Sequence, residues 1–309
     1  MGSSSSYSSY NSAFESTRAI LSEDEGEREI ARRARSARLE SAREAVLLGD
    51  VVKGAPMVEK RRIEEVFDPS SIRSSIGAVP ARAKRAVVVL VDNSGSNATI
   101  ARGMREASGY LTGVLRTIDP ETAVSFVYFS DLCDGADLIQ EADWVFGDPT
   151  GDRQLASTLS RVRGASGGDL PEAVSEALVR AAELDFAAVA RENRTVILVT
   201  DAVPHGMEGW AEATGERDDL PRPQLTWRSA MRRVREAFGR FVLIGSGDAP
   251  VTAGFQRKLF ETAPGVEDTS EVAENFVDLS GIRSAAHRNG IVTAAVLFVI
   301  ARSRGIQAL

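Results

Sequence analysis

The chain has 309 residues, a formal net charge of −7, 43% hydrophobic and 26% charged residues, and one cysteine. These fractions are typical of soluble globular proteins and exclude collagen-like and wholly disordered chains. The single cysteine, Cys133, has no partner for an internal disulfide, which excludes a disulfide-stapled scaffold and favours a reducing, cytoplasmic location. The acidic balance argues against a nucleic acid as partner.

The N-terminal region has the composition of an appendage. Residues 1–22 begin MGSSSSYSSYNSAF, lack the apolar stretch of a signal peptide, and are expected to form a disordered Ser/Tyr-rich tail. Residues 23–83 are expected to form a helical and irregular extension, because acidic and basic residues alternate at helical spacing over 23–44. This segment fits either a solvated helix or a docking helix that a partner covers.

Between residues 84 and 265, apolar runs alternate with amphipathic segments. Strands are expected at 86–91, 123–130, 144–146, 195–200 and 240–246, the third as a short edge strand. Helices are expected at 101–118, 171–186, 226–238 and 255–262. This order predicts an α/β domain with a doubly wound, mostly parallel central sheet and helices on both faces.

Residues 266–309 are expected to form a helical C-terminal extension. One or two helices are expected over 271–304, with a break near Asn289–Gly290. The apolar run at 291–301 is much shorter than the roughly 20 residues needed to cross a bilayer, so no transmembrane segment is predicted. Because this run is apolar nearly all round, it should be sandwiched within the domain or against another subunit.

Oxygen-bearing side chains follow the ends of the expected strands. Asp92, Ser94 and Ser96 follow the first strand, Asp201 follows the strand at 195–200, and Asp169 lies in a loop between them. Ligands of parallel α/β sheets collect at the carboxyl ends of the strands. Carboxylates and hydroxyls without a His or Cys cluster suit a hard cation, for which we expect Mg²⁺, with Mn²⁺ or Ca²⁺ as alternatives.

Three motifs occupy these loops: DNSGS at 92–96, SGGDLPEAV at 166–174 and VILVTDAVPHG at 196–206. Together they resemble the von Willebrand factor A domain and its metal-ion-dependent adhesion site, and the resemblance covers residues 84–264. It implies a Rossmann-like fold with a cation bound through the hydroxyls of Ser94 and Ser96. Asp92 and Asp201 would then accept hydrogen bonds from the serines or from water on the cation.

Asp169 occupies a position at which many adhesion-type members of the family have a threonine. The segment is similar to the GGGDxPE variety of many microbial members, with Ser166 in place of the first glycine. A third carboxylate should tighten cation binding but lower the residual positive charge, so a partner's Asp or Glu should be attracted less strongly. Alternatively, Asp169 caps a helix that begins at Pro171, with Glu172 in its first turn.

Other residues have simpler interpretations. Asp92 and the nearby serines could only cap the following helix. His205 is expected to be a loop histidine held by backbone hydrogen bonds, and His287 a surface or packing residue. Cys133 is expected to be an inert buried thiol.

Three functions fit these features. The first is a non-catalytic module that binds a divalent cation and mediates protein–protein interaction or assembly of a larger complex. The second is a scaffold subunit whose terminal extensions make metal-independent contacts, including those of a homo-oligomer. The third is an Mg²⁺-dependent phosphohydrolase with Asp92 as nucleophile and His205 assisting; it is disfavoured because the nearest cations for a phosphate, Arg102 and Arg163, lie outside the three loops.

We therefore expect a non-enzymatic protein that works through protein partners. Intracellular microbial proteins with this domain often act beside AAA-type ATPases or other multi-subunit machines, and the resemblance allows such a partner here. No organic cofactor is expected.

Overall fold

The computed structural model describes residues 76–164, 170–215, 218, 225–247, 249–261, 276–282 and 284–302. All of them belong to one compact unit, Asp68–Leu309. The expectations for the tail at 1–22 and for most of the extension at 23–83 lie outside the described residues, and so does Asp169.

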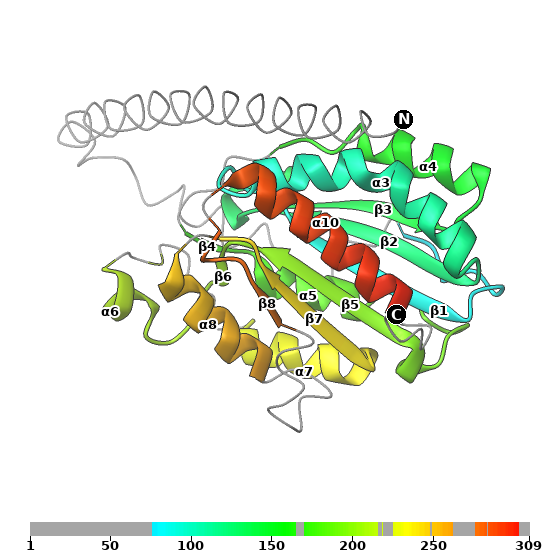
Figure 1. The fold of residues 1–309 in the computed structure, drawn as a ribbon. Helices are drawn as coiled ribbons and strands as arrows, with labels where there is room; N and C mark the ends of the chain where they lie inside the picture. The colour runs from blue at the N-terminus through cyan, green and yellow to red at the C-terminus, as the bar shows by residue number, and fades with distance from the viewer. Residues whose placement is uncertain are drawn as a thin grey trace, which may run out of the picture. The chain divides into compact units, whose positions relative to one another are not determined.

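A six-stranded sheet forms the centre of the domain, in the order β3-β2-β1-β5-β7-β8 (Figure 1). Its strands are β1 (Arg85–Asp92), β2 (Thr122–Phe129), β3 (Ile139–Val145), β5 (Arg194–Thr200), β7 (Arg240–Gly245) and β8 (Phe276–Asp278). All neighbouring pairs are parallel except β2 and β3. The predicted mostly parallel sheet with an edge strand near residue 144 is confirmed, although that strand begins earlier, at Ile139.

Helices cover both faces of the sheet, as expected. The helices α3 (Ala98–Ile118), α4 (Pro149–Leu159) and α10 (Ala285–Arg302) pack on one face, and α5 (Val174–Ala182), α7 (Trp227–Ala237) and α8 (Pro250–Glu261) on the other (Figure 1). There is also a short helix, α6 (Trp210–Thr214). A separate two-stranded ribbon consists of β4 (Pro171–Glu172) and β6 (Val203–Pro204). None of the described helices is long and apolar enough to cross a membrane.

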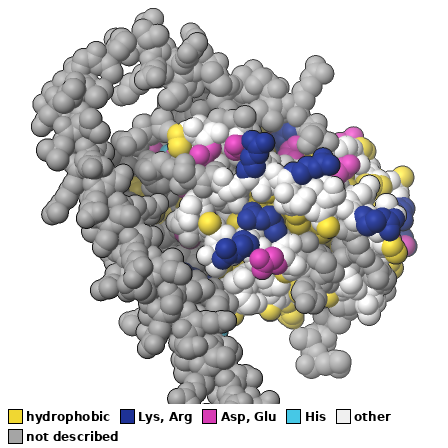
Figure 2. Space-filling view, turned by 90° about the horizontal axis from the view of Figure 1, so that it is seen from above, with side chains coloured by type: hydrophobic (Ala, Val, Ile, Leu, Met, Phe, Trp, Pro, Cys, Tyr) yellow, Lys and Arg dark blue, Asp and Glu magenta, His cyan; other side chains and the backbone are white. Residues whose placement is uncertain are grey.

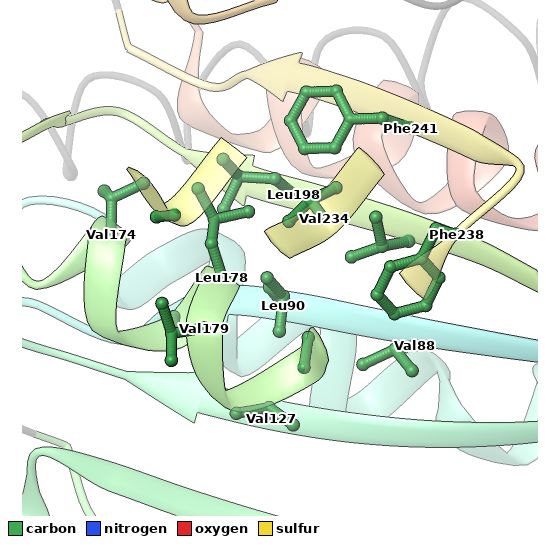
Figure 3. Packing of buried hydrophobic residues seen from close by; sticks show 14 of the residues in the cluster. Val88, Leu90, Val127, Val174, Leu178, Val179, Leu198, Val234, Phe238 and Phe241 are labelled. Atoms are coloured by element: carbon green, nitrogen blue, oxygen red, sulfur yellow. The ribbon is translucent and has the colours of Figure 1, made fainter. Parts of the chain in front are cut away.

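The two faces of the sheet build two hydrophobic cores. Along β1, Val88 and Leu90 contribute to the core under α5 and α7, whereas Val87, Val89 and Val91 contribute to the core under α3 and α10. Successive side chains of a strand point to opposite faces, so a strand that is covered on both sides must be apolar throughout. Figure 3 shows the first core, where side chains from the sheet meet those of α5 and α7.

The exposed surface is mixed in the view of Figure 2. Lys and Arg side chains are scattered over it, some of them beside Asp or Glu side chains, and the hydrophobic side chains form only small groups. Among the described side chains, this face carries no broad basic or apolar patch.

The helix expected at 171–186 begins later than predicted. Pro171 and Glu172 form β4, which pairs in parallel with β6, and α5 begins only at Val174, with Ala173 as its N-cap. The interpretation of Asp169 as the cap of this helix is therefore wrong. The error arose because Pro171 followed by Glu172 has the sequence signature of a helix start, whereas pairing with a distant strand placed both residues in a ribbon.

The described part of 266–309 contributes one strand to the sheet and one helix to the layer that covers it. β8 extends the sheet beyond β7, and α10 packs along α3. The expected break near Asn289–Gly290 is wrong, because α10 runs through it and packs the Asn289 side chain over Gly103, where a Cβ would collide with it. Within this chain the run is not covered all round, since Ile291 and Phe298 are 38% and 47% exposed, and cover by another subunit stays a prediction.

The strand order creates a switch point at the centre of the sheet. β1 lies between β2 and β5, and the chain leaves β1 through α3 on one face, whereas α5 leads to β5 on the other face. Loops that diverge from two neighbouring parallel strands leave a crevice at their carboxyl ends. In this domain, Asp92 and Asp201 lie at the carboxyl ends of these two strands.

Candidate functional site

Asp92 ends the central strand with a fully buried side chain. Its Oδ1 accepts a hydrogen bond from the backbone N–H of Ser94 at 2.9 Å, and its Oδ2 accepts one from the Thr200 hydroxyl at 2.7 Å. Thr200 ends the neighbouring strand β5, and the parallel register places the two side chains next to each other. The carboxylate of Asp92 is therefore fixed in orientation.

Two hydroxyls connect this loop to the end of β5. Ser94 Oγ and Ser96 Oγ lie 3.1 Å apart, and Ser96 Oγ donates to Asp201 Oδ1 at 3.1 Å. Ser94 is buried, whereas Ser96 is exposed. The structure thus brings together four of the five residues that the sequence pointed to: Asp92, Ser94, Ser96 and Asp201. Whether they bind a metal stays a prediction.

Two amide side chains that the sequence did not single out hold these loops. Asn97 donates from Nδ2 to the backbone carbonyl of Asp92 at 2.8 Å and accepts, through Oδ1, from the Ser246 hydroxyl at 2.7 Å. Gln256 of α8 donates to the backbone carbonyls on either side of Asp201, both at 3.0 Å. Gln256 is one of two polar side chains that α8 buries, the other being Thr252, and its sequence position gave no sign of this role.

Asn93 connects the first loop to the segment that leads toward Asp169. Its Nδ2 donates to the carbonyl of Arg163 at 2.5 Å, and its Oδ1 accepts from Arg105 Nη1 at 3.0 Å. Gln140 of β3 holds the same backbone through bonds of 2.7 and 2.9 Å to the N–H and carbonyl of Arg163. The chain is therefore anchored beside the site just before residues 165–169.

Glu172, which the sequence did not single out, is a further buried acid that interacts electrostatically with Asp92 and Asp201. Its side chain is buried, and its Oε2 has no hydrogen-bond partner. Burial raises the pKa of Glu172 to about 10, and the carboxylates of Asp92, Asp131, Asp201 and Asp134 add to the rise. The sequence offers a signal, because Glu172 belongs to the same motif as Asp169, but the pattern predicts it in the first turn of a helix.

Asp92 and Asp201 share this acidic environment. Burial raises the pKa of Asp92, against the hydrogen bonds from Ser94 and Thr200, which lower it. Burial and the neighbouring Asp92 carboxylate raise the pKa of Asp201 to about 8. Within the described part of the chain, no Lys or Arg side chain pairs with Asp92, Asp201 or Glu172.

Comparisons with known proteins find similar folds among solved structures. No protein-family profile matches the chain, and no curated protein matches it. Among solved structures, the pilus adhesin SpaC from Lactobacillus rhamnosus GG superimposes with a TM-score of 0.50 at 14% identity, over 74% of this chain and 31% of that one. The described domain has the von Willebrand factor A fold.

Two further solved structures are similar at lower scores. A von Willebrand factor type A protein from Catenulispora acidiphila has 16% identity and a TM-score of 0.46, over 72% of this chain and 43% of that one. Proximal thread matrix protein 1 from the mussel byssus has 14% identity and a TM-score of 0.43, over 72% and 48%. The chain spans less than half the length of each of these proteins.

The donor set at these strand ends fits a hard divalent cation. Hydroxyl and carboxylate oxygens are the ligands that Mg²⁺ prefers, and buried acids without a counter-charge gain most from a dication. Among the described residues, no three His, Cys, Asp or Glu side chains are arranged to hold an ion. The hydroxyls of Ser94 and Ser96 would therefore have to take part, and Glu172 Oε2 is a further available donor.

His205 is held by carboxylates, so the expectation of backbone partners is wrong. Its Nε2 lies 2.8 Å from Asp131 Oδ1, and its Nδ1 lies 2.8 Å from Asp218 Oδ1. Burial alone would lower the pKa of His205, but the hydrogen bonds to both carboxylates outweigh it and raise the pKa to about 9. Sequence spacing gave no sign of this contact, because Asp131 follows β2 and His205 follows β6, 74 residues further along the chain.

Cys133 is exposed rather than buried, which corrects a second expectation. Its thiol donates to Asp131 Oδ2 at 3.2 Å. Partial desolvation and this hydrogen bond raise the pKa of Cys133 to about 12, so the group stays a thiol and is a poor nucleophile, in line with the expected inertness. His287 lies exposed on α10, as expected.

Proposed function

We propose that this protein is a non-catalytic interaction module that binds one divalent cation at the switch point of its sheet and uses that face to bind a protein partner. The residues that would hold the cation, directly or through water, are Asp92, Ser94, Ser96, Asp169, Glu172 and Asp201. Mg²⁺ is the best candidate, with Mn²⁺ and Ca²⁺ as alternatives. A bound cation would supply neutralising charge and an open coordination position.

The observation that carries this proposal is the chain of oxygen atoms from Ser94 through Ser96 to Asp201. Both links are 3.1 Å long, and they join loops from two different strands beside the buried Asp92. Capping of the following helix does not account for them, because Asn97 is the N-cap of α3 and no side chain caps that helix. A shared hard cation accounts for all four residues at once.

The charge at the site bears on the kind of partner. Asp92, Asp201 and Glu172 together exceed the charge of a dication when all are ionised. A partner that offers an Asp or Glu to the open coordination position is therefore disfavoured compared with one that offers a neutral oxygen. The loop with the motif at 166–174 also has an exposed apolar side chain in its described part. This is Leu170, which lies two residues before Glu172 and could contact a partner.

A non-catalytic role is favoured over phosphohydrolysis by the state of His205. Both of its ring nitrogens already face carboxylates at 2.8 Å, so no nitrogen lone pair is free to act as a base. The similar pilus adhesin is, by its name, an adhesion protein. This supports an interaction role in general and no particular partner.

The proposal extends to a cytoplasmic location and to a larger assembly, such as one built around an AAA-type ATPase.

The proposed function is tested by affinity capture from the native cell. The full chain serves as bait in the presence of Mg²⁺ or of chelator, and the variant Ser94→Ala/Ser96→Ala is compared with the wild type. Exposed serines of the α4 region provide the matched control, Ser157→Ala/Ser160→Ala. We expect the partner to be lost from the wild type in chelator and from Ser94→Ala/Ser96→Ala in Mg²⁺. The control variant Ser157→Ala/Ser160→Ala should retain it in Mg²⁺. Partners that persist in every sample would support the scaffold alternative instead.

A further inference from the structure

Glu172 lies on β4, a two-residue strand that needs contacts with the rest of the domain to be stable. The β4–β6 ribbon (Pro171–Glu172 with Val203–Pro204) consists of two residue pairs, Pro171 with Val203 and Glu172 with Pro204. A two-stranded ribbon is only marginally stable even at greater length. Two residue pairs alone do not fix the buried Glu172 side chain, so contacts outside the ribbon must hold it in place.

Those contacts converge on two consecutive residues at the end of β2. On the β4 side, the backbone N–H of Ala173 donates to the carbonyl of Ser130 at 3.1 Å. On the β6 side, His205 directly follows the strand and contacts Asp131 Oδ1 through Nε2 at 2.8 Å. Both strands of the ribbon are therefore tied to the same point of the main sheet, one by its backbone and the other by an imidazole.

The surroundings of His205 favour the charged imidazolium form, because both ring nitrogens face carboxylate oxygens. The side chains of His205 and Asp131 are 3% and 0% exposed, and the second ring nitrogen faces Asp218. A neutral imidazole has one N–H and would turn a lone pair toward one of the carboxylates, whereas an imidazolium donates to both. Cys133 and the Leu132 N–H also donate to Asp131, so that carboxylate is held from several sides.

We propose that His205 is a positioning residue for the cation site: it pins the β4–β6 ribbon, and with it the Glu172 carboxylate, to the end of β2. This inference rests on the proposed function, since it assigns His205 a role through Glu172 and not as a ligand. A partner of the residues that hold a metal typically changes metal affinity by about 10- to 100-fold when it is removed. His205 should therefore affect cation affinity without touching the cation.

A double-mutant cycle tests this role. Mn²⁺ is titrated calorimetrically into the full chain as wild type, His205→Gln, Glu172→Gln and the double variant, with His287→Gln as the control histidine. We expect His205→Gln to bind Mn²⁺ about 10- to 100-fold more weakly than wild type. On the Glu172→Gln background, the same substitution should have almost no further effect, because the carboxylate that it positions is gone.

A milder variant covers the case in which His205→Gln does not fold. Asp218→Asn removes only the outer carboxylate and should weaken binding in the same direction by a smaller factor, again only when Glu172 is present. Equal affinities for wild type and the His205 or Asp218 variants, or effects that add to that of Glu172→Gln, would overturn the inference and leave the proposed function standing. Absence of Mn²⁺ binding by the wild type would overturn both.

Discussion

The Thr200 hydroxyl donates a hydrogen bond of 2.7 Å to Asp92 Oδ2 and so joins the carboxyl ends of the two central strands. Both groups are fully buried, and the second oxygen of Asp92 is bonded to the Ser94 N–H. The sheet itself therefore determines how this carboxylate is oriented.

Replacing Thr200 by Val should destabilise the protein, because it leaves Asp92 Oδ2 buried without a donor. The expected loss is about 1–3 kcal/mol in the free energy of unfolding, measured by urea denaturation. Thr195→Val, at the other end of the same strand and also buried, is the matched control and should cost less. Equal losses for the two variants would show that the bond to Asp92 contributes nothing specific.

Glu172→Gln should raise stability and lower cation affinity at the same time. In the metal-free protein at pH 7, Glu172 must take up a proton on folding, because burial and the surrounding acids raise its pKa to about 10. A neutral amide avoids this cost, so a gain of up to about 3 kcal/mol is expected in chelator. In Mn²⁺ titrations, the same variant should bind more weakly.

Glu176→Gln is the control for that comparison, because Glu176 is also buried and lies one turn along α5. It should leave cation affinity unchanged. A Glu172 variant that is both less stable and equally able to bind Mn²⁺ would exclude Glu172 from the site.

The contribution of His205 to stability should depend on pH in a definite direction. Its pKa is about 9 in the folded protein against 6.5 for an unperturbed imidazole. The stabilisation is therefore complete below about pH 6.5 and is lost as the pH rises through 9. In chelator, the difference in unfolding free energy between wild type and His205→Gln should approach about 3 kcal/mol at pH 6 and shrink by pH 10. A difference that is constant over this range would contradict a charged His205.

Asp169→Asn tests the one predicted ligand that lies outside the described residues. If Asp169 serves the site, the variant should bind Mn²⁺ at least about tenfold more weakly, by calorimetric titration, because a carboxylate near the cation is lost. Asp185→Asn, an exposed acid beyond the other end of α5, should bind as the wild type does. Unchanged affinity in Asp169→Asn would leave Glu172 as the acid from this loop.

The parts of the fold that depend on local pattern were predictable. The runs at 86–91 and 195–200 are apolar at every position because both faces of their strands are covered, and this is visible without coordinates. The same logic located Asp92 and Asp201, because the residue after a buried parallel strand must lie at the ligand-binding edge.

What escaped prediction depends on contacts between distant segments. The sequence predicts Glu172 in a helix because Pro171 is a good first helical residue, whereas the pairing of β4 with β6 places it in a strand. The carboxylate partners of His205 come from after β2 and from position 218, and no spacing rule relates them. β8 was missed because three residues are too few for a strand pattern.

The central claim is that one hard cation binds where Asp92, Ser94, Ser96 and Asp201 meet. The most direct measurement is a titration of the full chain with Mn²⁺, in which free ion is followed by electron paramagnetic resonance, for wild type, Ser94→Ala/Ser96→Ala and Ser157→Ala/Ser160→Ala. We predict that wild type and the second pair each bind one ion per chain and that the first pair binds none while remaining folded. No binding by the wild type, or equal binding by all three proteins, would contradict the account.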